Sequence, residues 1–178
     1  MSTDVLAIID EALGLLQPYG IPITNNARAM LYAIAGQEAG WQHRFQISKR
    51  ADGTSYRGPA RGLWQFELGG GVRGVLEHEA SNTIAYRVAT GFVGDFAYGG
   101  YTGETAVWAV LPYEDVLAAA FARLLLWTDR RKLPDPSQAN AEVAWGIYNS
   151  VWRPGKPHKA KWAANWLAAV KVVEKGAC

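Results

Sequence analysis

The sequence predicts one mainly α-helical domain over residues 1–178, with a small β-hairpin region. Three observations lead to this prediction. Apolar residues recur at helical spacing in several long segments, residues 40–74 are rich in turn-forming residues, and no repeat or long linker divides the chain. With 178 residues, 49% hydrophobic and 19% charged, the chain is long enough to bury its own core.

Two amphipathic helices are expected in the first forty residues. The first covers residues 4–16, with Ser2 or Thr3 as its cap. The second covers residues 27–38 and ends at Gly40, because a glycine after the last periodic residue is typical of a helix C-terminus.

Residues 40–74 follow a different pattern, with little sheet and one small hairpin expected. A short extended segment is predicted at residues 62–67, where Leu63, Gln65 and Glu67 alternate with two aromatic residues. In an extended strand this alternation places Gln65 and Glu67 on the same side.

The rest of the chain again shows helical spacing. The helix expected at residues 113–128 is nearly apolar, so we predict that it is the central buried one. Residues 91–105 are rich in glycine and aromatic residues and are expected to form a loop. The other helices are expected at residues 72–78, 82–89, 137–150 and 159–175.

Composition excludes several classes of function. A net charge of +2 is too small to indicate nucleic-acid binding, although it favours approach to an anionic polymer such as a bacterial wall. The single cysteine, Cys178, excludes an internal disulfide framework, and the three scattered histidines argue against a metal site. We expect a soluble protein without cofactor, signal peptide or transmembrane segment.

Glu38 is the first candidate for chemistry. It lies four residues after Ile34 and seven after Leu31, on the apolar stripe of the second expected helix. Partial burial disfavours the ionised carboxylate and raises its pKa, which is what the general acid of a glycosidase requires. The alternative is a glutamate whose side chain reaches solvent at the helix end.

Two further segments carry polar residues in a suggestive order. Ala-Arg-Gly-Leu-Trp-Gln-Phe-Glu begins at Ala60, and Ala-Trp-Gly-Ile-Tyr-Asn begins at Ala144. Taken separately, the first is more typical of a hairpin edge on which Trp64 packs, and the second of a helix whose Tyr148 packs in the core.

Taken together, the three segments resemble the lysozyme superfamily, in particular the soluble lytic transglycosylase and goose-type lysozyme branch. Its members have a catalytic Glu at a helix end, a Gly-Leu-Met-Gln-Ile-like strand and a later Ala-Tyr-Asn-Ala-Gly-like helix. This chain has Gln-Glu-Ala-Gly-Trp at residues 37–41, Gly-Leu-Trp-Gln-Phe at residues 62–66 and Ile-Tyr-Asn at residues 147–149. It departs from the pattern at Trp64, at Ala39 and Gly40, and at Ser150. The chain also resembles bacteriophage endolysins.

The resemblance implies a lysozyme-like helical domain with an active-site cleft that degrades peptidoglycan. The enzyme would cut the β-1,4 bond between N-acetylmuramic acid and N-acetylglucosamine. The catalytic residues would be Glu38, the proton donor, Tyr148, which orients that carboxyl, and Glu67, a second carboxylate. The residues expected to bind substrate are Gln65, Trp41, Trp64, Asn149 and Trp152, although for each tryptophan taken separately core packing is favoured.

The reaction outcome stays open at this point. Hydrolysis uses two carboxylates, with Glu67 favoured over Asp52 as the second, whereas lytic transglycosylases use one and leave anhydro-muramic products. A chitinase-like glycosidase, a non-catalytic wall-binding module and a structural virion component are the remaining alternatives. For an endolysin we expect a monomer made in the host cytoplasm that reaches the periplasmic wall after holin-dependent release.

Overall fold

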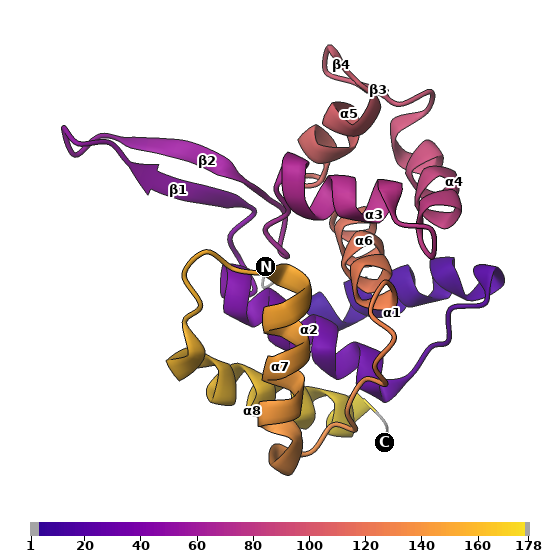
Figure 1. Cartoon of the computed structure of the whole chain (residues 1–178), viewed down its shortest axis with the longest axis vertical. Helices are drawn as coiled ribbons and strands as arrows, with labels where there is room; N and C mark the ends of the chain where they lie inside the picture. Colours follow the sequence, from indigo (N-terminus) through magenta and orange to yellow (C-terminus); the bar gives the residue numbers. More distant parts are fainter. Residues whose placement is uncertain (1–3, 177–178) are drawn as a thin grey trace.

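The computed structural model describes residues 4–176, and within this range the protein is mainly helical with two small antiparallel sheets. The mainly α-helical class is therefore confirmed. Eight α-helices follow one another in the described range (Figure 1): α1 (Val5–Leu16), α2 (Asn25–Ala39), α3 (Arg73–Glu77), α4 (Asn82–Val93), α5 (Gly103–Val110), α6 (Asp115–Trp127), α7 (Ala141–Trp152) and α8 (Lys159–Gly176). Three shorter helical turns are η1 (Gln17–Tyr19), η2 (Leu68–Val72) and η3 (Gln138–Asn140).

Helix α6 lies at the centre of the structure. Ten of its 13 residues are buried, which confirms the central buried helix predicted at residues 113–128. Helix α1 packs along α6, and α2 packs along α8. Helices α3, α4 and α5 gather on another side of α6, in the upper part of Figure 1, while α2, α7 and α8 form the lower part.

The first two helices have the ends that their residues favour. The Asp4 carboxylate accepts the Ala7 N–H at 3.2 Å and caps α1, whereas the caps expected at Ser2 or Thr3 lie outside the described residues. Gly40 ends α2 in the left-handed conformation at φ +54°, as predicted.

A hairpin of β1 (Phe45–Lys49) and β2 (Ser55–Arg61) projects from the helical body (Figure 1). Its strands are antiparallel, with Ile47 opposite Arg57. A second pair, β3 (Ala97–Tyr98) and β4 (Tyr101–Thr102), is only two residues long. The sequence predicted one small hairpin, and the second pair was not expected.

The extended segment predicted at residues 62–67 is wrong. Residues 62–65 form a tight turn that is closed by two backbone hydrogen bonds between Arg61 and Phe66, at 3.0 and 2.8 Å. The turn buries Leu63, Trp64 and Phe66 together, which an alternating strand would not do. Alternation over six residues is too short a pattern to distinguish a strand from a buried turn.

The loop predicted at residues 91–105 is also wrong in part. Helix α4 extends to Val93, and α5 begins at Gly103 and runs to Val110. Helix α5 has only eight residues and follows a glycine-rich segment, so its stripe was too short to recognise. Among the described residues, every helix is too short or too polar to cross a membrane.

Candidate active-site cleft

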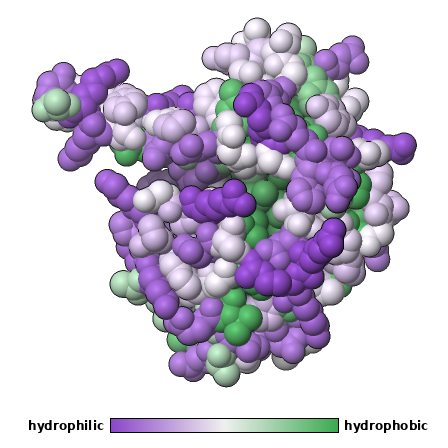
Figure 2. All heavy atoms as spheres, in the orientation of Figure 1, coloured by the Kyte–Doolittle hydropathy of each residue, from purple (hydrophilic) through white to green (hydrophobic). Residues whose placement is uncertain are grey.

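A cleft of about 1270 Å³ lies between η2 and the start of α3 on one side and the end of α7 on the other. The end of α2, the turn after β2 and the end of α6 complete its walls. Figure 2, in the orientation of Figure 1, shows hydrophobic surface at the centre of this face with hydrophilic side chains around it. The volume is above the usual range for small-molecule pockets.

Glu38 lines this cleft and is held by a residue far along the chain. Tyr148 on α7 donates its phenolic O–H to Glu38 Oε1 on α2 at 2.5 Å, across 110 positions of sequence. Tyr148 is only 2% exposed, while Glu38 is half-buried. The short bond gives the carboxyl one fixed orientation toward the cleft.

The surroundings of Glu38 favour its protonated form. Burial raises the pKa of Glu38 from an ordinary 4.5 to about 7, and the negative charge of Glu67 also raises it. The hydrogen bond from Tyr148 lowers that pKa, because it stabilises the carboxylate, but burial outweighs it. A pKa this far above the ordinary value lets the carboxyl keep its proton near neutral pH, as a general acid requires.

An aromatic stack holds Tyr148 in place. Its ring lies 5.0 Å from the ring of Trp162 on α8, at an interplanar angle of 14°. Trp162 in turn donates its indole N–H to the Ala141 carbonyl at the start of α7, at 2.8 Å. Helix α7 is thus fixed on α8 at its first residue and at Tyr148, so the phenol has little freedom to leave Glu38.

The cleft brings a second carboxylate near Glu38. Glu67 lines the cleft with an exposed side chain, and its charge acts on Glu38. Asp52 lies in the exposed turn between β1 and β2, where its carboxylate accepts the backbone N–H of Thr54 at 2.9 Å. Asp52 does not line the cleft, so only Glu67 of the two is placed for a role there.

Two of the predicted substrate-binding residues line the cleft. The Gln65 amide donates to the Gly62 carbonyl at 2.8 Å, so its side chain is fixed against the turn. Trp152 donates its indole N–H to the Trp64 carbonyl at 3.2 Å and keeps part of its ring exposed. Gln65 offers the cleft a polar edge, and Trp152 offers a partly exposed aromatic face.

The other three predicted substrate-binding residues are not in the cleft. Trp64 is fully buried, which agrees with the core packing favoured for it and excludes the sugar platform, and its indole N–H donates to the Leu31 carbonyl at 3.0 Å. Trp41 packs on Tyr32 and donates to its carbonyl at 2.9 Å, outside the cleft. Asn149 is exposed on α7 but does not line the cleft. Sequence order alone did not reveal on which side of its segment each residue lies.

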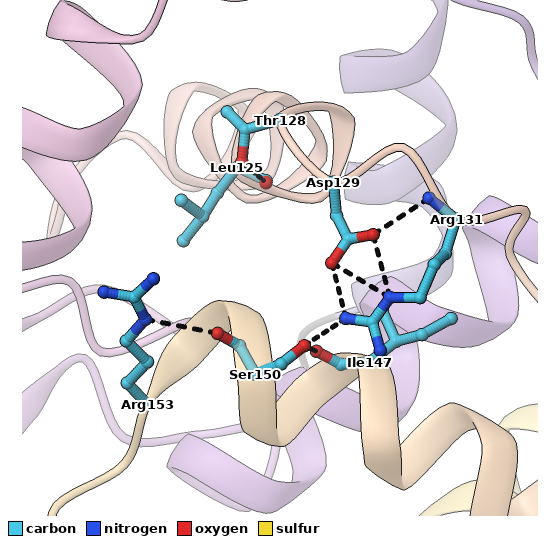
Figure 3. Close-up of polar contacts among 7 residues, drawn as sticks. All are labelled: Leu125, Thr128, Asp129, Arg131, Ile147, Ser150 and Arg153. Carbon is cyan, nitrogen blue, oxygen red and sulfur yellow. Dashed lines mark hydrogen bonds and ion pairs between the residues drawn. The ribbon is translucent and has the colours of Figure 1, made fainter.

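A polar bridge crosses from the end of α6 to the end of α7, and the sequence did not predict it. The Asp129 carboxylate accepts two hydrogen bonds from Arg131 Nε, at 2.9 and 3.1 Å (Figure 3). The same guanidinium donates to Ser150 Oγ on α7, and the Ser150 carbonyl accepts from Arg153 Nε at 3.3 Å. Asp129, Ser150 and Arg153 all line the cleft. The charged run at residues 129–132 was the available signal.

Within residues 4–176, no three His, Cys, Asp or Glu side chains gather where they could hold a metal ion. Comparisons of the chain with protein-family models, curated proteins and solved structures find no match. The site must therefore be interpreted from its own geometry and from the sequence pattern.

Proposed function

We propose that this protein is a peptidoglycan-degrading glycosidase of lysozyme-like fold, with Glu38 as its general acid. The observation that carries the proposal is the half-buried carboxyl of Glu38, which lines a large cleft and receives the O–H of a buried tyrosine. Its pKa of about 7 lets it hold a proton near neutral pH and transfer it to a glycosidic oxygen. The sequence order of the motifs at residues 37–41, 62–66 and 147–149 supports the same function.

In the proposed mechanism a glycan strand lies along the cleft with one glycosidic oxygen beside Glu38. Tyr148 is a positioning residue that aims the Glu38 proton at this oxygen, and the leaving sugar takes the proton as the bond breaks. Glu67 is the second carboxylate, which either activates a water molecule or stabilises the positive charge on the sugar ring. Gln65 and Trp152 contact the sugars on either side.

Substitution of Glu38 by glutamine tests the proposal. Glu38→Gln keeps the size of the side chain and removes the transferable proton, so the rate of wall clearing should fall by about 1000-fold while the circular dichroism spectrum stays unchanged. Glu79→Gln is the matched control, because Glu79 is exposed and does not line the cleft. Full activity in Glu38→Gln would reject the mechanism.

The products of digestion separate the possible reactions. Mass spectrometry of digested peptidoglycan should give reducing ends, as hydrolysis with a second carboxylate requires. Glu67→Gln should then be strongly impaired as well. Anhydro-muramic ends, with an active Glu67→Gln variant, would instead identify a transglycosylase that uses Glu38 alone. Activity on chitin oligomers and none on peptidoglycan would identify a chitinase-like enzyme.

A further inference from the structure

A second cavity of about 500 Å³ lies beside the cleft, between the segment that leads into α2 and the end of α6. Pro22, Thr24 and Asn26 line one side of it, and Trp127 and Leu133 line the other. The remaining lining is strongly cationic, with a single carboxylate, Asp129, and four basic residues: Arg123, Arg130, Arg131 and Lys132.

Arg123 is the unusual residue in this cavity. It lies on the buried face of α6 and is only 4% exposed, yet its Nε has no hydrogen-bond partner among the described residues. Its guanidinium carbon lies 5.0 Å from the centre of the Trp127 ring, one helical turn further along α6. No carboxylate within residues 4–176 forms an ion pair with it, and Asp129, the carboxylate of the cavity lining, pairs with Arg131.

A buried charge without a partner destabilises a folded protein, because the charge loses its water and gains nothing in return. Burial lowers the pKa of Arg123 to about 10, so the guanidinium is still charged at neutral pH. The cation–π contact with Trp127 recovers only part of the lost hydration. The cavity therefore contains a permanent positive charge, a free N–H donor and space of the size that small ligands occupy.

We propose that this cavity is a binding site for the carboxylate or phosphate group of a small ligand. The anionic group pairs with the Arg123 guanidinium, the Trp127 ring packs against the apolar part of the ligand, and Arg130 and Lys132 attract the ligand to the opening. The Asp129–Arg131–Ser150 bridge borders the cavity, and Asp129 lines both the cavity and the cleft. Glu38 lines the cleft and not this cavity, so the ligand is distinct from the glycan segment at Glu38.

Titration calorimetry and thermal unfolding of the full chain test this proposal with two probes, inorganic phosphate and the acidic dipeptide Ala-Glu. At a probe concentration about ten times its Kd, the Tm of the wild type should rise by about 4 °C. Arg123→Met fills similar space without a charge. It should have a Tm about 3 °C higher than the wild type when no probe is present, and should bind at least about tenfold more weakly. The matched control Arg87→Met removes an exposed arginine of α4 and should bind like the wild type.

The two probes distinguish the source of the anionic group. Tighter binding of phosphate indicates a free or polymer-borne phosphate, and tighter binding of Ala-Glu indicates the carboxylates of a peptide. Failure of both probes to bind at 10 mM, or equal binding by the wild type and Arg123→Met, would overturn the proposal. Neither measurement uses lytic activity, so the result is independent of whether the protein cuts peptidoglycan.

Discussion

Glu38 is subject to two opposing influences. Burial disfavours its charge, and the O–H of Tyr148 favours it, with burial the stronger of the two. The same balance that keeps a proton available for transfer also destabilises the folded protein when that proton is lost. The protonation state of Glu38 is therefore expected to affect both the stability of the folded protein and the rate of the proposed reaction.

Stability should therefore depend on pH through Glu38. Between its unfolded pKa of 4.5 and its folded pKa of about 7, the folded protein keeps a proton that the unfolded chain has released, so the free energy of unfolding falls as pH rises. The total loss is about 3 kcal/mol. Urea denaturation of the wild type and Glu38→Gln at pH 4 and pH 8 measures it, since the difference between the two proteins cancels all other titrating groups. An equal difference at both pH values would contradict the assignment.

Tyr148→Phe removes the hydrogen bond that lowers the pKa of Glu38, so that pKa should rise further. In the wild type, activity should decline as pH rises through about 7, because Glu38 must be protonated to act. In Tyr148→Phe this decline should move upward by about 0.5–1 pH unit, with kcat reduced about tenfold and KM little changed. The pH–rate profile measures the shift. Tyr86→Phe, at an exposed tyrosine on α4, is the control and should leave the profile unchanged.

The turn at residues 62–65 determines which side chains reach the cleft. Gly62 has φ +72°, and a Cβ added there would lie 3.0 Å from the Leu111 carbonyl oxygen and 3.3 Å from Ala118 Cβ. The turn thus lies directly against the start of α6. Gln65 and Glu67 line the cleft because the chain reverses here, and not because they alternate along a strand.

Gly62→Ala should destabilise the protein by about 3 kcal/mol, through backbone strain and collision with Leu111. Gly53→Ala is the matched control, because Gly53 has φ +83° in the β1–β2 turn but open space around it. It should cost only about 1 kcal/mol, from backbone strain alone. Chemical denaturation measures both values. An equal decrease in the free energy of unfolding in the two variants would show that the contact with Leu111 does not contribute to the destabilisation.

Among the elements, the long amphipathic helices were predictable, and of the short helices α3 was predicted at residues 72–78 while α5 was not. Helices α1, α2, α6 and α8 each have 12 or more residues, so their apolar stripes repeat several times and identify them. Helix α5 has only eight residues and the turn at residues 62–65 is shorter still, so neither contains an apolar stripe that repeats several times. Their conformation follows from packing on η2 and α6, which no local pattern reports.

At the scale of the whole molecule, the buried tryptophans connect segments that are distant in the sequence. Trp64, Trp162 and Trp166 are buried, and each donates its indole N–H to a backbone carbonyl of another segment. This arrangement fixes the turn after β2 on α2, and α8 on α7 and the segment before it. Three tryptophans had been expected to bind substrate, but of these only Trp152 lines the cleft.

Local features of the sequence were enough to predict the helical class, the C-terminal end of α2 at Gly40 and the inward placement of Glu38, because caps and apolar stripes act over a few residues. The hydrogen bond from Tyr148 to Glu38, the polar bridge at Asp129 and the unsatisfied Nε of Arg123 became known only from the folded chain. Burial and hydrogen-bond partners depend on neighbours that are distant in sequence, and a pKa depends on both.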